Sequence, residues 1–549
     1  MPLQKNQVLT LQVERLSSDG SGVAHSPEGE TVFIPGAAPG DEARVRIVKD
    51  CKRYAFGILD EVLKPSPDRI PVDCAVAGPC GGCSLRHLDY AAELRAKQEN
   101  VADAFARIGG LDVPVLPIVG SPEIDRYRNK VQFPVGTDKA GRPCIGFYAG
   151  RTHRIVPCPD CRLQPGVLNE IGNTLCAFFA EKGIHPYNEE TGKGLVRHIF
   201  LRRGAHSGQI MVCLVCTRAK LPSAEELCTR LKEAFPDIVT ILLNVNAKNT
   251  NVILGSETHT LYGQGYIEDT LCGVPVQLGP LSFYQVNTLA AEQLYGIASE
   301  YAQLTPDDLL LDLYCGMGTI GLSMADHCRE LVGVEIVPEA IESAKANAAR
   351  MGAAVSAKSR FFCADAGQAA AQLAAEGLHP DVVMLDPPRK GCDEATLSAV
   401  VRMAPRRVVY VSCNPATAAR DAAWLEQNGY HAEKVQPVDL FPRTKHVETV
   451  VLLSKGEVDS KKIRVEFSLE DMDMSEFQDG ATYTQIKDYV LEHSGLKVSN
   501  LYISQIKRKC GIEVGKNYNL PKSEDSRQPQ CPPEKEKAIR EAFKYFGMI

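Results

Sequence analysis

Two different periods of apolar residues divide the chain. Over residues 1–62, apolar and polar residues alternate in runs such as VLTLQVERL and DEARVRIVKD, separated by turn signals such as SSDGSG and SPEGE. Alternation with a period of two, interrupted by turns, is typical of a small antiparallel barrel. We therefore predict an N-terminal β-barrel over this range.

The pattern changes twice more before residue 456. Residues 91–290 open with an amphipathic helix over 90–110 and continue with strand-like runs such as LVRHIFLRR, which predicts a central α+β domain. Residues 291–455 repeat apolar strand, glycine turn and helix, as in LLLDLYCGMGTIGLSMA and RVVYVSCNP. This repeat predicts a parallel, doubly wound α/β sheet of Rossmann type, which binds ligands at the carboxyl ends of its strands.

The last part, residues 457–549, is rich in helix formers. TYTQIKDYVLEHSG and PPEKEKAIREAFKYF are predicted helices, and no group of residues there suggests catalysis. We expect a small, mostly helical extension of unknown function. The whole chain is therefore predicted to be multidomain, in agreement with a length of 549 residues.

Composition narrows the class of protein. A chain with 44% hydrophobic and 23% charged residues is typical of a soluble globular protein. No uninterrupted apolar run approaches about 18 residues, and the N-terminus lacks a signal-peptide pattern, so we expect a cytoplasmic protein without a membrane span. The net charge of −7 neither indicates nor excludes a nucleic-acid partner. The 19 cysteines, an odd number, favour thiols, metal ligands or nucleophiles over a disulfide framework.

Three cysteines form a dense cluster in the loop over residues 63–90. Cys74, Cys80 and Cys83 have the spacing C-x5-C-x2-C among glycines. Soft thiolates at this spacing among glycines suit a metal centre, and four of them would also suit zinc. A fourth ligand is needed, and Cys158 and Cys161 in RIVPCPDC are the candidates.

The glycine turn DLYCGMGTIG predicts a cofactor site. Its glycines allow a cofactor to approach the backbone closely, and Glu335 ends the following strand, where a carboxylate accepts hydrogen bonds from ribose hydroxyls. Taken alone, the turn also suits a nicotinamide fold. Together with Glu335 it resembles the S-adenosylmethionine site of class I methyltransferases. Asp365 in CADAG and Asp386 in DPPRKG each follow a later strand.

A thiol and a carboxyl mark the same edge of the predicted sheet. Cys413 ends the strand YVSC, and Asn414 and Pro415 then break that strand. Glu448 in FPRTKHVE begins the last strand. A cysteine on a strand is most often a buried small hydrophobe, but a thiol beside an acid at this edge is a candidate nucleophile with a candidate base.

The motifs FYQVN, DLYCGMG, DPPR, SCNP and FPRTKHVE follow one another along the chain, and in this order they resemble the RNA uracil-C5 methyltransferases. The first 62 residues resemble a TRAM domain, an RNA-binding barrel of the oligonucleotide-binding type. With the C-x5-C-x2-C element, the resemblance narrows to the subfamily that methylates a uridine of 23S ribosomal RNA and carries a 4Fe-4S cluster. It covers residues 1–455.

This resemblance implies a role for each matching residue. Cys413 and Glu448 would be catalytic. The cluster ligands would be Cys74, Cys80, Cys83 and Cys161, with Cys158 as an extra cysteine. A monomer acting on 23S rRNA is expected. The S-adenosylmethionine-binding positions would be Gln285, Tyr314, Thr319, Glu335, Asp365 and Asp386.

Three alternatives remain open. The substrate of the same chemistry could be tRNA. A methyltransferase acting on a base nitrogen would need no cysteine and would carry an aromatic residue after the Asp-Pro-Pro motif, where this chain has Arg389. A non-enzymatic RNA-binding module would leave Cys413 and Glu448 without a role.

Basic residues indicate two possible RNA-contacting surfaces. The run over residues 44–56 combines basic side chains with Tyr54 and Phe56, which suits phosphate contact and base stacking as well as a solvated strand edge. In the central domain, six cations form a possible cationic face, namely Arg126, Arg128, Lys130, Arg197, Arg202 and Arg203.

Overall fold

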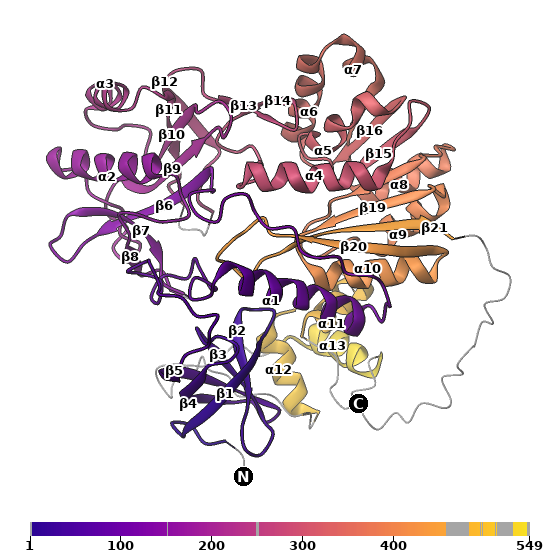
Figure 1. The fold of residues 1–549 in the computed structure, drawn as a ribbon, viewed down its shortest axis with the longest axis horizontal. Helices are drawn as coiled ribbons and strands as arrows, with labels where there is room; N and C mark the ends of the chain where they lie inside the picture. The colour runs from indigo at the N-terminus through magenta and orange to yellow at the C-terminus, as the bar shows by residue number, and fades with distance from the viewer. Residues whose placement is uncertain are drawn as a thin grey trace. The chain divides into compact units, whose positions relative to one another are not determined.

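The computed structural model describes residues 3–150, 152–248 and 252–456, and in the C-terminal part 483–494, 496, 498–510, 512 and 531–545. The chain separates into two compact units, Met1–Asp459 and Ser460–Ile549. Figure 1 shows the order of the elements along the chain.

The N-terminal segment forms the expected barrel. Its five strands close in the order β1-β2-β3-β5-β4. Alternate residues point inward, and Val13, Val32, Val45 and Ile47 fill the interior. The strands are β1 (Val8–Leu16), β2 (Ser21–His25), β3 (Thr31–Pro35), β4 (Glu42–Asp50) and β5 (Tyr54–Lys64).

The central part is a seven-stranded mixed sheet in the order β12-β11-β10-β9-β6-β7-β8, followed by the hairpin β13-β14. The expected first helix is α1 (Tyr90–Asp103), which continues as a π-helical turn to Ile108 and stops before two glycines. The remaining helices are α2 (Gly166–Glu181) and α3 (Ala224–Ala234). The strands are β6 (Lys130–Thr137), β7 (Pro143–Tyr148), β8 (Ile155–Pro157), β9 (Val196–Arg203), β10 (Ile210–Cys216), β11 (Ile238–Val245), β12 (Glu257–Tyr262), β13 (Ile267–Leu271) and β14 (Val274–Leu278).

Residues 288–455 form the doubly wound sheet, in the order β17-β16-β15-β18-β19-β21-β20. The first five strands in this order are parallel, and β21 is antiparallel to both β19 and β20. The strand order reverses between β15 and β18. The strands are β15 (Leu309–Leu313), β16 (Glu330–Glu335), β17 (Ser359–Cys363), β18 (Val382–Leu385), β19 (Arg407–Ser412), β20 (Tyr430–Val438) and β21 (Glu448–Lys455).

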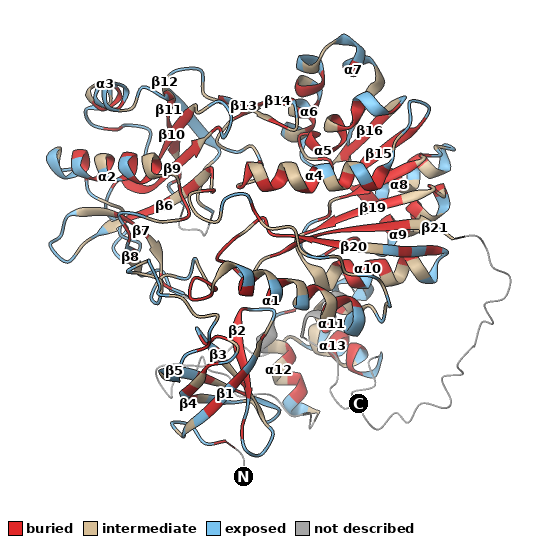
Figure 2. Cartoon of the chain, viewed as in Figure 1, coloured by how far each residue is buried: buried red, intermediate tan, exposed pale blue. Residues whose placement is uncertain are grey.

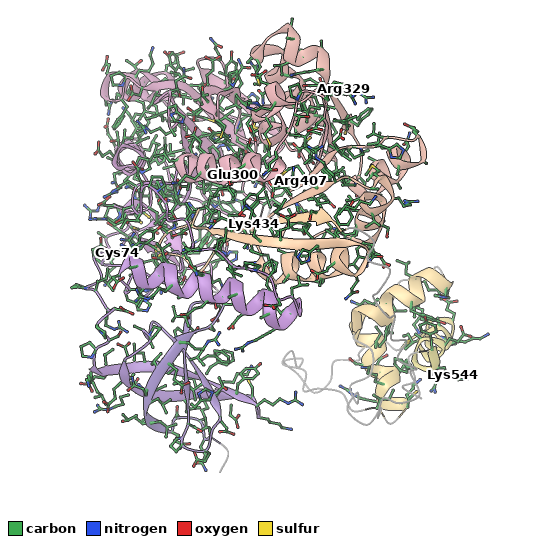
Figure 3. The ribbon with its side chains drawn as sticks, turned by 45° about the vertical axis from the view of Figure 1, so that its right-hand side comes forward. Cys74, Glu300, Arg329, Arg407, Lys434 and Lys544 are labelled. Carbon is green, nitrogen blue, oxygen red and sulfur yellow. The ribbon has the colours of Figure 1, made fainter. Side chains whose placement is uncertain are left out.

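Helices cover both faces of this sheet, and its strands are largely buried (Figures 1 and 2). Alternate strand residues contribute to two separate cores, one under α4, α5 and α6 and the other under α8, α9, α10 and the end of α1. At the edge, Lys434 of β20 lies over the Tyr301 ring of α4, with Nζ 4.1 Å from the ring centroid (Figure 3). The helices are α4 (Thr288–Ala302), α5 (Thr319–Ser323), α6 (Pro338–Met351), α7 (Ala353–Lys358), α8 (Ala366–Ala375), α9 (Glu394–Met403) and α10 (Pro415–Gln427).

The second unit contains the helices α11 (Tyr483–Ser494), α12 (Asn500–Lys509) and α13 (Pro533–Tyr545). The predicted helices correspond to α11 and α13, while their outermost residues lie outside the described ranges. Ile486, Ile503, Ile506 and Phe543 meet in a core of their own. The described part of the chain contains no helix that is both long and apolar enough to cross a membrane.

Candidate active site and cysteine cavity

The turn after β15 lies at the point where the strand order reverses. Tyr314, Gly316 and Gly318 all have positive φ angles, of 65°, 54° and 78°. A Cβ atom at Gly316 would meet no atom within 4 Å, whereas at Gly318 it would lie 3.2 Å from Ala344 Cβ. The turn is therefore open on the side of Gly316 and tightly packed behind Gly318. Open backbone at such a reversal is where doubly wound sheets receive a cofactor.

Glu335 is fixed by backbone amides at the end of β16. One of its carboxylate oxygens accepts from Gly316 N at 3.1 Å, and the other from Ile336 N and Val337 N at 2.8 and 3.0 Å. These bonds connect the acid to the cofactor turn. The exposed apolar side chains of Ile336 and Val337 flank it, and apolar surface beside a fixed carboxylate suits an adenosine group.

The other proposed cofactor residues reach this region from different elements. Thr319 begins α5, and its Oγ1 lies 3.4 Å from the hydroxyl of Tyr295, which is buried on α4. Gln285 precedes α4, and its carbonyl accepts from Asn129 Nδ2 at 2.7 Å. Asp365 caps α8 by accepting from two backbone amides of the first turn. The structure thus brings segments far apart in the sequence to one edge of the sheet.

Cys413 and Glu448 occupy adjacent positions at the carboxyl end of β19. Ser412 pairs with Thr449 in the antiparallel ladder, so the same register continued by one residue brings Cys413 opposite Glu448. Thr449 Oγ1 also donates to Ser412 O at 3.2 Å. Directly opposite side chains in such a ladder lie close together on one face. Cys413 is half-buried and Glu448 is buried.

Burial and the neighbouring charges shift the pKa values of both Cys413 and Glu448. Burial raises the pKa of Glu448 to about 8, with a further increase from the Asp386 carboxyl and an opposing effect of Arg389. Burial also raises the pKa of the Cys413 thiol, which Glu448 raises further and the neighbouring Arg389 guanidinium lowers. Perturbed acid and thiol groups side by side in a pocket are typical of catalytic sites.

Two further carboxyls, Asp386 and Asp312, lie toward the carboxyl ends of β18 and β15 and have raised pKa values. Burial raises the pKa of Asp386 to about 7. Burial also raises the pKa of Asp312 to about 8, although its Oδ2 accepts from Gly321 N at 3.0 Å. Oδ1 of Asp312 has no hydrogen-bond partner among the described residues. Sequence reasoning left Asp312 out because nothing in the motif distinguishes its buried position within β15.

Sequence reasoning named Arg389 in the motif DPPRKG and gave it no role beside the thiol. Asn414 Nδ2 donates to Arg389 O at 3.0 Å, and Asn414 Oδ1 caps α10, so the strand-breaking Asn holds Arg389 beside the thiol. Phe283, two residues before Gln285, leaves 70% of its surface exposed.

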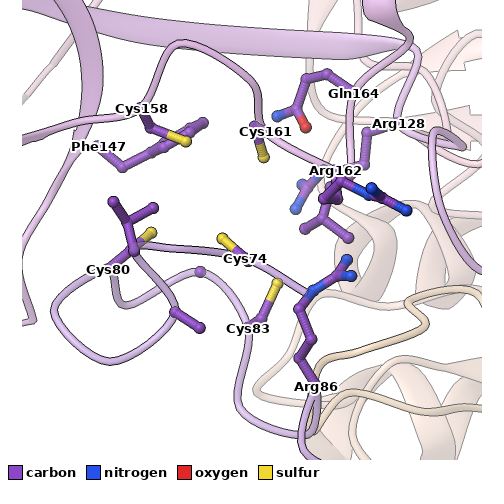
Figure 4. Close-up of a pocket in the computed structure, with 14 residues that line it drawn as sticks. Cys74, Cys80, Cys83, Arg86, Arg128, Phe147, Cys158, Cys161, Arg162 and Gln164 are labelled. Carbon is purple, nitrogen blue, oxygen red and sulfur yellow. The ribbon is translucent and has the colours of Figure 1, made fainter. Parts of the chain in front are cut away.

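The second feature is a cavity of about 130 Å³, called here the cysteine cavity. Figure 4 shows the sulfur atoms of five cysteines turned toward its interior, from Cys74, Cys80, Cys83, Cys158 and Cys161. A hydrogen bond from Cys158 lowers the pKa of Cys161 to about 7, while the pKa of Cys158 is raised by the same bond. Both candidates for the fourth ligand therefore line one cavity. Within the described ranges, no three His, Cys, Asp or Glu side chains come together as ligands of a single metal ion.

Three of the six residues of the expected cationic face use their donors inside the protein. Arg197 and Arg202 are buried in β9, a strand covered on both sides, and donate to backbone carbonyls, Arg202 to Gly279 O and Ser282 O at 2.9 and 2.7 Å. Arg126 binds the loop of Cys161 through Asp160 and two carbonyls. These residues are structural because their donors are used inside the protein.

The sheet order, the open turn and the pair at β19 define a class I methyltransferase, and comparisons with known proteins narrow the class. The model of the tRNA (uracil-5-)-methyltransferase family matches residues 207–456, and that of the TRAM domain matches residues 2–59. The chain belongs to the family of S-adenosylmethionine-dependent RNA (uracil-5-)-methyltransferases. Residues after 456 lie outside both family models.

Individual relatives agree with this assignment. An uncharacterized RNA methyltransferase of Halalkalibacterium halodurans is 44% identical over 453 residues, which are 82% of this chain and 98% of the relative. Another of Clostridium tetani is 41% identical over 83% of this chain and 98% of its own length. The solved structure of Pyrococcus abyssi tRNA (uracil-54, C5)-methyltransferase with S-adenosyl-L-homocysteine has a TM-score of 0.65 and 28% identity, covering 81% of this chain and all of that one.

Proposed function

We propose that the protein transfers a methyl group from S-adenosylmethionine to carbon 5 of a uridine in 23S ribosomal RNA, with Cys413 as nucleophile and Glu448 as base. The observation that carries this proposal is the register of β19 and β21, which brings a thiol opposite a buried carboxyl at the edge that faces the cofactor turn. A base-nitrogen methyltransferase would leave this pair without a role.

The residues account for each step of the chemistry. Carbon 5 of uracil is a weak nucleophile, and the Cys413 thiolate adds to carbon 6, which gives an enolate. Carbon 5 then attacks the methyl group of S-adenosylmethionine and S-adenosylhomocysteine leaves. Glu448 takes the proton from carbon 5, the carbon 6–sulfur bond breaks, and the thiolate is released with methylated uracil.

The electrostatics suit these roles. Arg389 lowers the pKa of a thiol that burial raises, and so favours the attacking thiolate. Glu448 has a pKa of about 8, and a base works best when its pKa lies near the operating pH. Phe283 offers an exposed ring on which a base can stack after it leaves the RNA stack.

For the methyl donor we propose six binding residues around the open turn. The carboxylate of Glu335, already oriented by three amides, is suited to the ribose hydroxyls. Tyr314 holds a left-handed backbone conformation, which is strained for a non-glycine residue and common at functional sites. The complete set is Gln285, Tyr314, Thr319, Glu335, Asp365 and Asp386.

A 4Fe-4S cluster fits the cysteine cavity. Beside the thiols, Arg86 and Arg162 line it, and each leaves Nε without a hydrogen-bond partner among the described residues, as an anionic cluster would require. Four thiolates suit a four-iron cluster, and they also suit a zinc ion. When bound, the cluster cross-links the loops through its iron–thiolate bonds.

We propose Cys74, Cys80, Cys83 and Cys161 as its ligands. The peptide of Cys161 is held on both sides, since its amide donates to Asn169 Oδ1 at 3.3 Å and its carbonyl accepts from Arg126 and Asn169. Cys161→Ser should therefore lower the iron content and visible absorption of anaerobically purified protein more than Cys158→Ser. The opposite order would assign the fourth ligand to Cys158.

The RNA is the second part of the proposal. We expect a cytoplasmic monomer that contacts RNA through the TRAM barrel, and the solved relative that acts on tRNA makes tRNA the second candidate. Mass mapping of 5-methyluridine in 23S rRNA and tRNA, from cells with and without the gene, separates the two. Loss of the mark from tRNA alone would overturn the ribosomal assignment.

Trapping on RNA that contains 5-fluorouracil tests the mechanism. Fluorine at carbon 5 cannot be removed as a proton, so the enzyme should remain bound to its substrate as a covalent species on a denaturing gel. Cys413→Ala should abolish this species and retain S-adenosylhomocysteine binding. Cys228→Ala, a buried cysteine of α3, is the matched control. Absence of trapping in the unmodified protein would refute covalent catalysis.

A further inference from the structure

We propose that Tyr127 is a positioning residue for catalysis. Its hydroxyl connects the loops that line the cysteine cavity to the segment that leads into Glu448. This segment, residues 439–447, is called here the base segment and runs from β20 to β21. The proposal rests on the proposed function, in which Glu448 is the base. It concerns how a carboxyl without a hydrogen bond of its own keeps its place.

Three consecutive carbonyls of the base segment accept hydrogen bonds from buried donors. Phe441 O accepts from Lys97 Nζ at 3.1 Å, and Pro442 O accepts from the Tyr127 hydroxyl at 2.9 Å. Arg443 O accepts from two backbone amides at 3.1 Å each. Glu448 follows only five residues later. Its backbone is held on one side by the ladder pairing with Val438, and the contacts of these carbonyls constrain the chain that leads into it.

One wall of the cysteine cavity supplies the contact to Arg443. Cys83 lines the cavity, and the amides of the next two residues, Ser84 and Leu85, are the donors to Arg443 O. Arg443 also has a φ of 68°, and its Nη1 donates to Leu88 O at 3.0 Å. A displacement of the Cys83 loop would thus move Arg443.

The opposite wall supplies the contact to Pro442. Arg126 binds Cys161 O and Gln164 O at 3.0 and 3.1 Å, which fixes the loop that carries Cys161. The next residue is Tyr127, whose buried hydroxyl donates to Pro442 O. Proline has no amide to donate, so this carbonyl is its means of backbone hydrogen bonding. The two walls therefore hold neighbouring residues of the base segment.

Positioning through the backbone matters because no hydrogen bond fixes the Glu448 carboxyl among the described residues. Proton transfer requires the base within hydrogen-bond reach of carbon 5, and small displacements of a catalytic group cost large factors in rate. Removal of the Tyr127 hydroxyl should loosen Pro442 and leave the thiol, the cofactor turn and every cysteine unchanged. The affected step is then loss of the carbon 5 proton, not adduct formation.

Tyr127→Phe tests this inference, with Tyr430→Phe as its matched control. Both hydroxyls belong to buried tyrosines and donate to a proline carbonyl at 2.9 Å, Tyr430 to Pro405 O, which lies outside the base segment. Loss of one such bond should lower thermal stability alike in both variants. Only Tyr127→Phe should lower kcat, by roughly five- to tenfold with KM little changed, and raise the fraction of enzyme found as a covalent species on ordinary RNA.

Two further readouts separate the possible failures. Hydrogen exchange of amides in residues 443–447 should be faster in Tyr127→Phe than in Tyr430→Phe, at unchanged iron content and S-adenosylhomocysteine affinity. Equal kinetics and exchange in the two variants would overturn the positioning role. If the unmodified protein itself forms no adduct with 5-fluorouracil RNA, the proposed function fails, and the proposal for Tyr127 fails with it.

Discussion

Glu448→Gln should stabilise the protein at alkaline pH and stop its chemistry. In the native protein the pKa of this buried carboxyl is raised from 4.5 to about 8, so between these values the folded state binds more protons than the unfolded state. Stability must then fall as pH rises through this window, because the charge has to be buried. Glutamine keeps the shape and does not ionise.

The size of the effect follows from the shift. A change from 4.5 to about 8, at about 1.4 kcal/mol per pKa unit, corresponds to about 5 kcal/mol as an upper limit. Relaxation of the protein around a buried charge lowers its cost, so we expect a gain of about 2 to 5 kcal/mol over the native protein at pH 9 and little gain at pH 4.5. The gain should grow steadily between these pH values.

Urea unfolding at a series of pH values measures this gain for Glu448→Gln against the native protein. Glu376→Gln, on an exposed residue after α8, is the control and should show no pH-dependent gain. In the same preparations, Glu448→Gln should lower kcat at least about 100-fold and accumulate the methylated covalent adduct. A gain in stability that is the same at every pH would refute the buried, titrating carboxyl on which the argument depends.

Three further predictions concern other parts of the structure. Lys97→Met should cost about 3 to 5 kcal/mol, since Lys97 bridges two buried carboxyls, whereas Lys345→Met on an exposed pair should cost under about 0.5 kcal/mol in the same unfolding assay. Gly318→Ala should weaken S-adenosylhomocysteine binding at least about tenfold by calorimetry, because its Cβ would press on packed side chains, whereas Gly377→Ala, with equal φ strain in open space, should leave affinity unchanged. Arg389→Gln should raise the pKa of the nucleophilic Cys413 thiol. The rate of adduct formation with 5-fluorouracil RNA should then reach its maximum at a higher pH than in the native protein. An unchanged pH profile of this rate would exclude a role of Arg389 in activating the thiol.

The sequence predicted the parts of the fold that local patterns determine. Alternating residues indicated the barrel, and repeated strands and glycine turns indicated the doubly wound sheet, because burial on one or both faces leaves a direct periodic signal. The end of the strand at Cys413 was also predictable, because Asn414 and Pro415 break a strand, and the structure begins α10 at Pro415. Such features need only a few neighbouring residues.

Contacts between distant segments could not be predicted in this way. Arg202 is a buried donor to carbonyls of Gly279 and Ser282, 77 and 80 residues away, and on sequence alone it looked like a surface cation. The Tyr127 hydroxyl meets Pro442 across 315 residues. Alternation along a strand gives the same pattern for a buried arginine and an exposed one, so only the tertiary structure separates them.

The raised pKa values at the site share one physical origin that connects them to the methyl donor. Desolvation raises the pKa of Asp312 to about 8 and that of Asp386 to about 7, and the neighbouring Asp386 and Glu335 carboxyls raise the pKa of Asp312 further. S-adenosylmethionine carries a positive sulfonium, which would favour the ionised carboxylates, whereas the product thioether is neutral. Transfer of the methyl group therefore removes the charge that stabilises the bound state. Under the proposed function, carboxyls of raised pKa beside the donor would therefore favour the cationic donor over the neutral product.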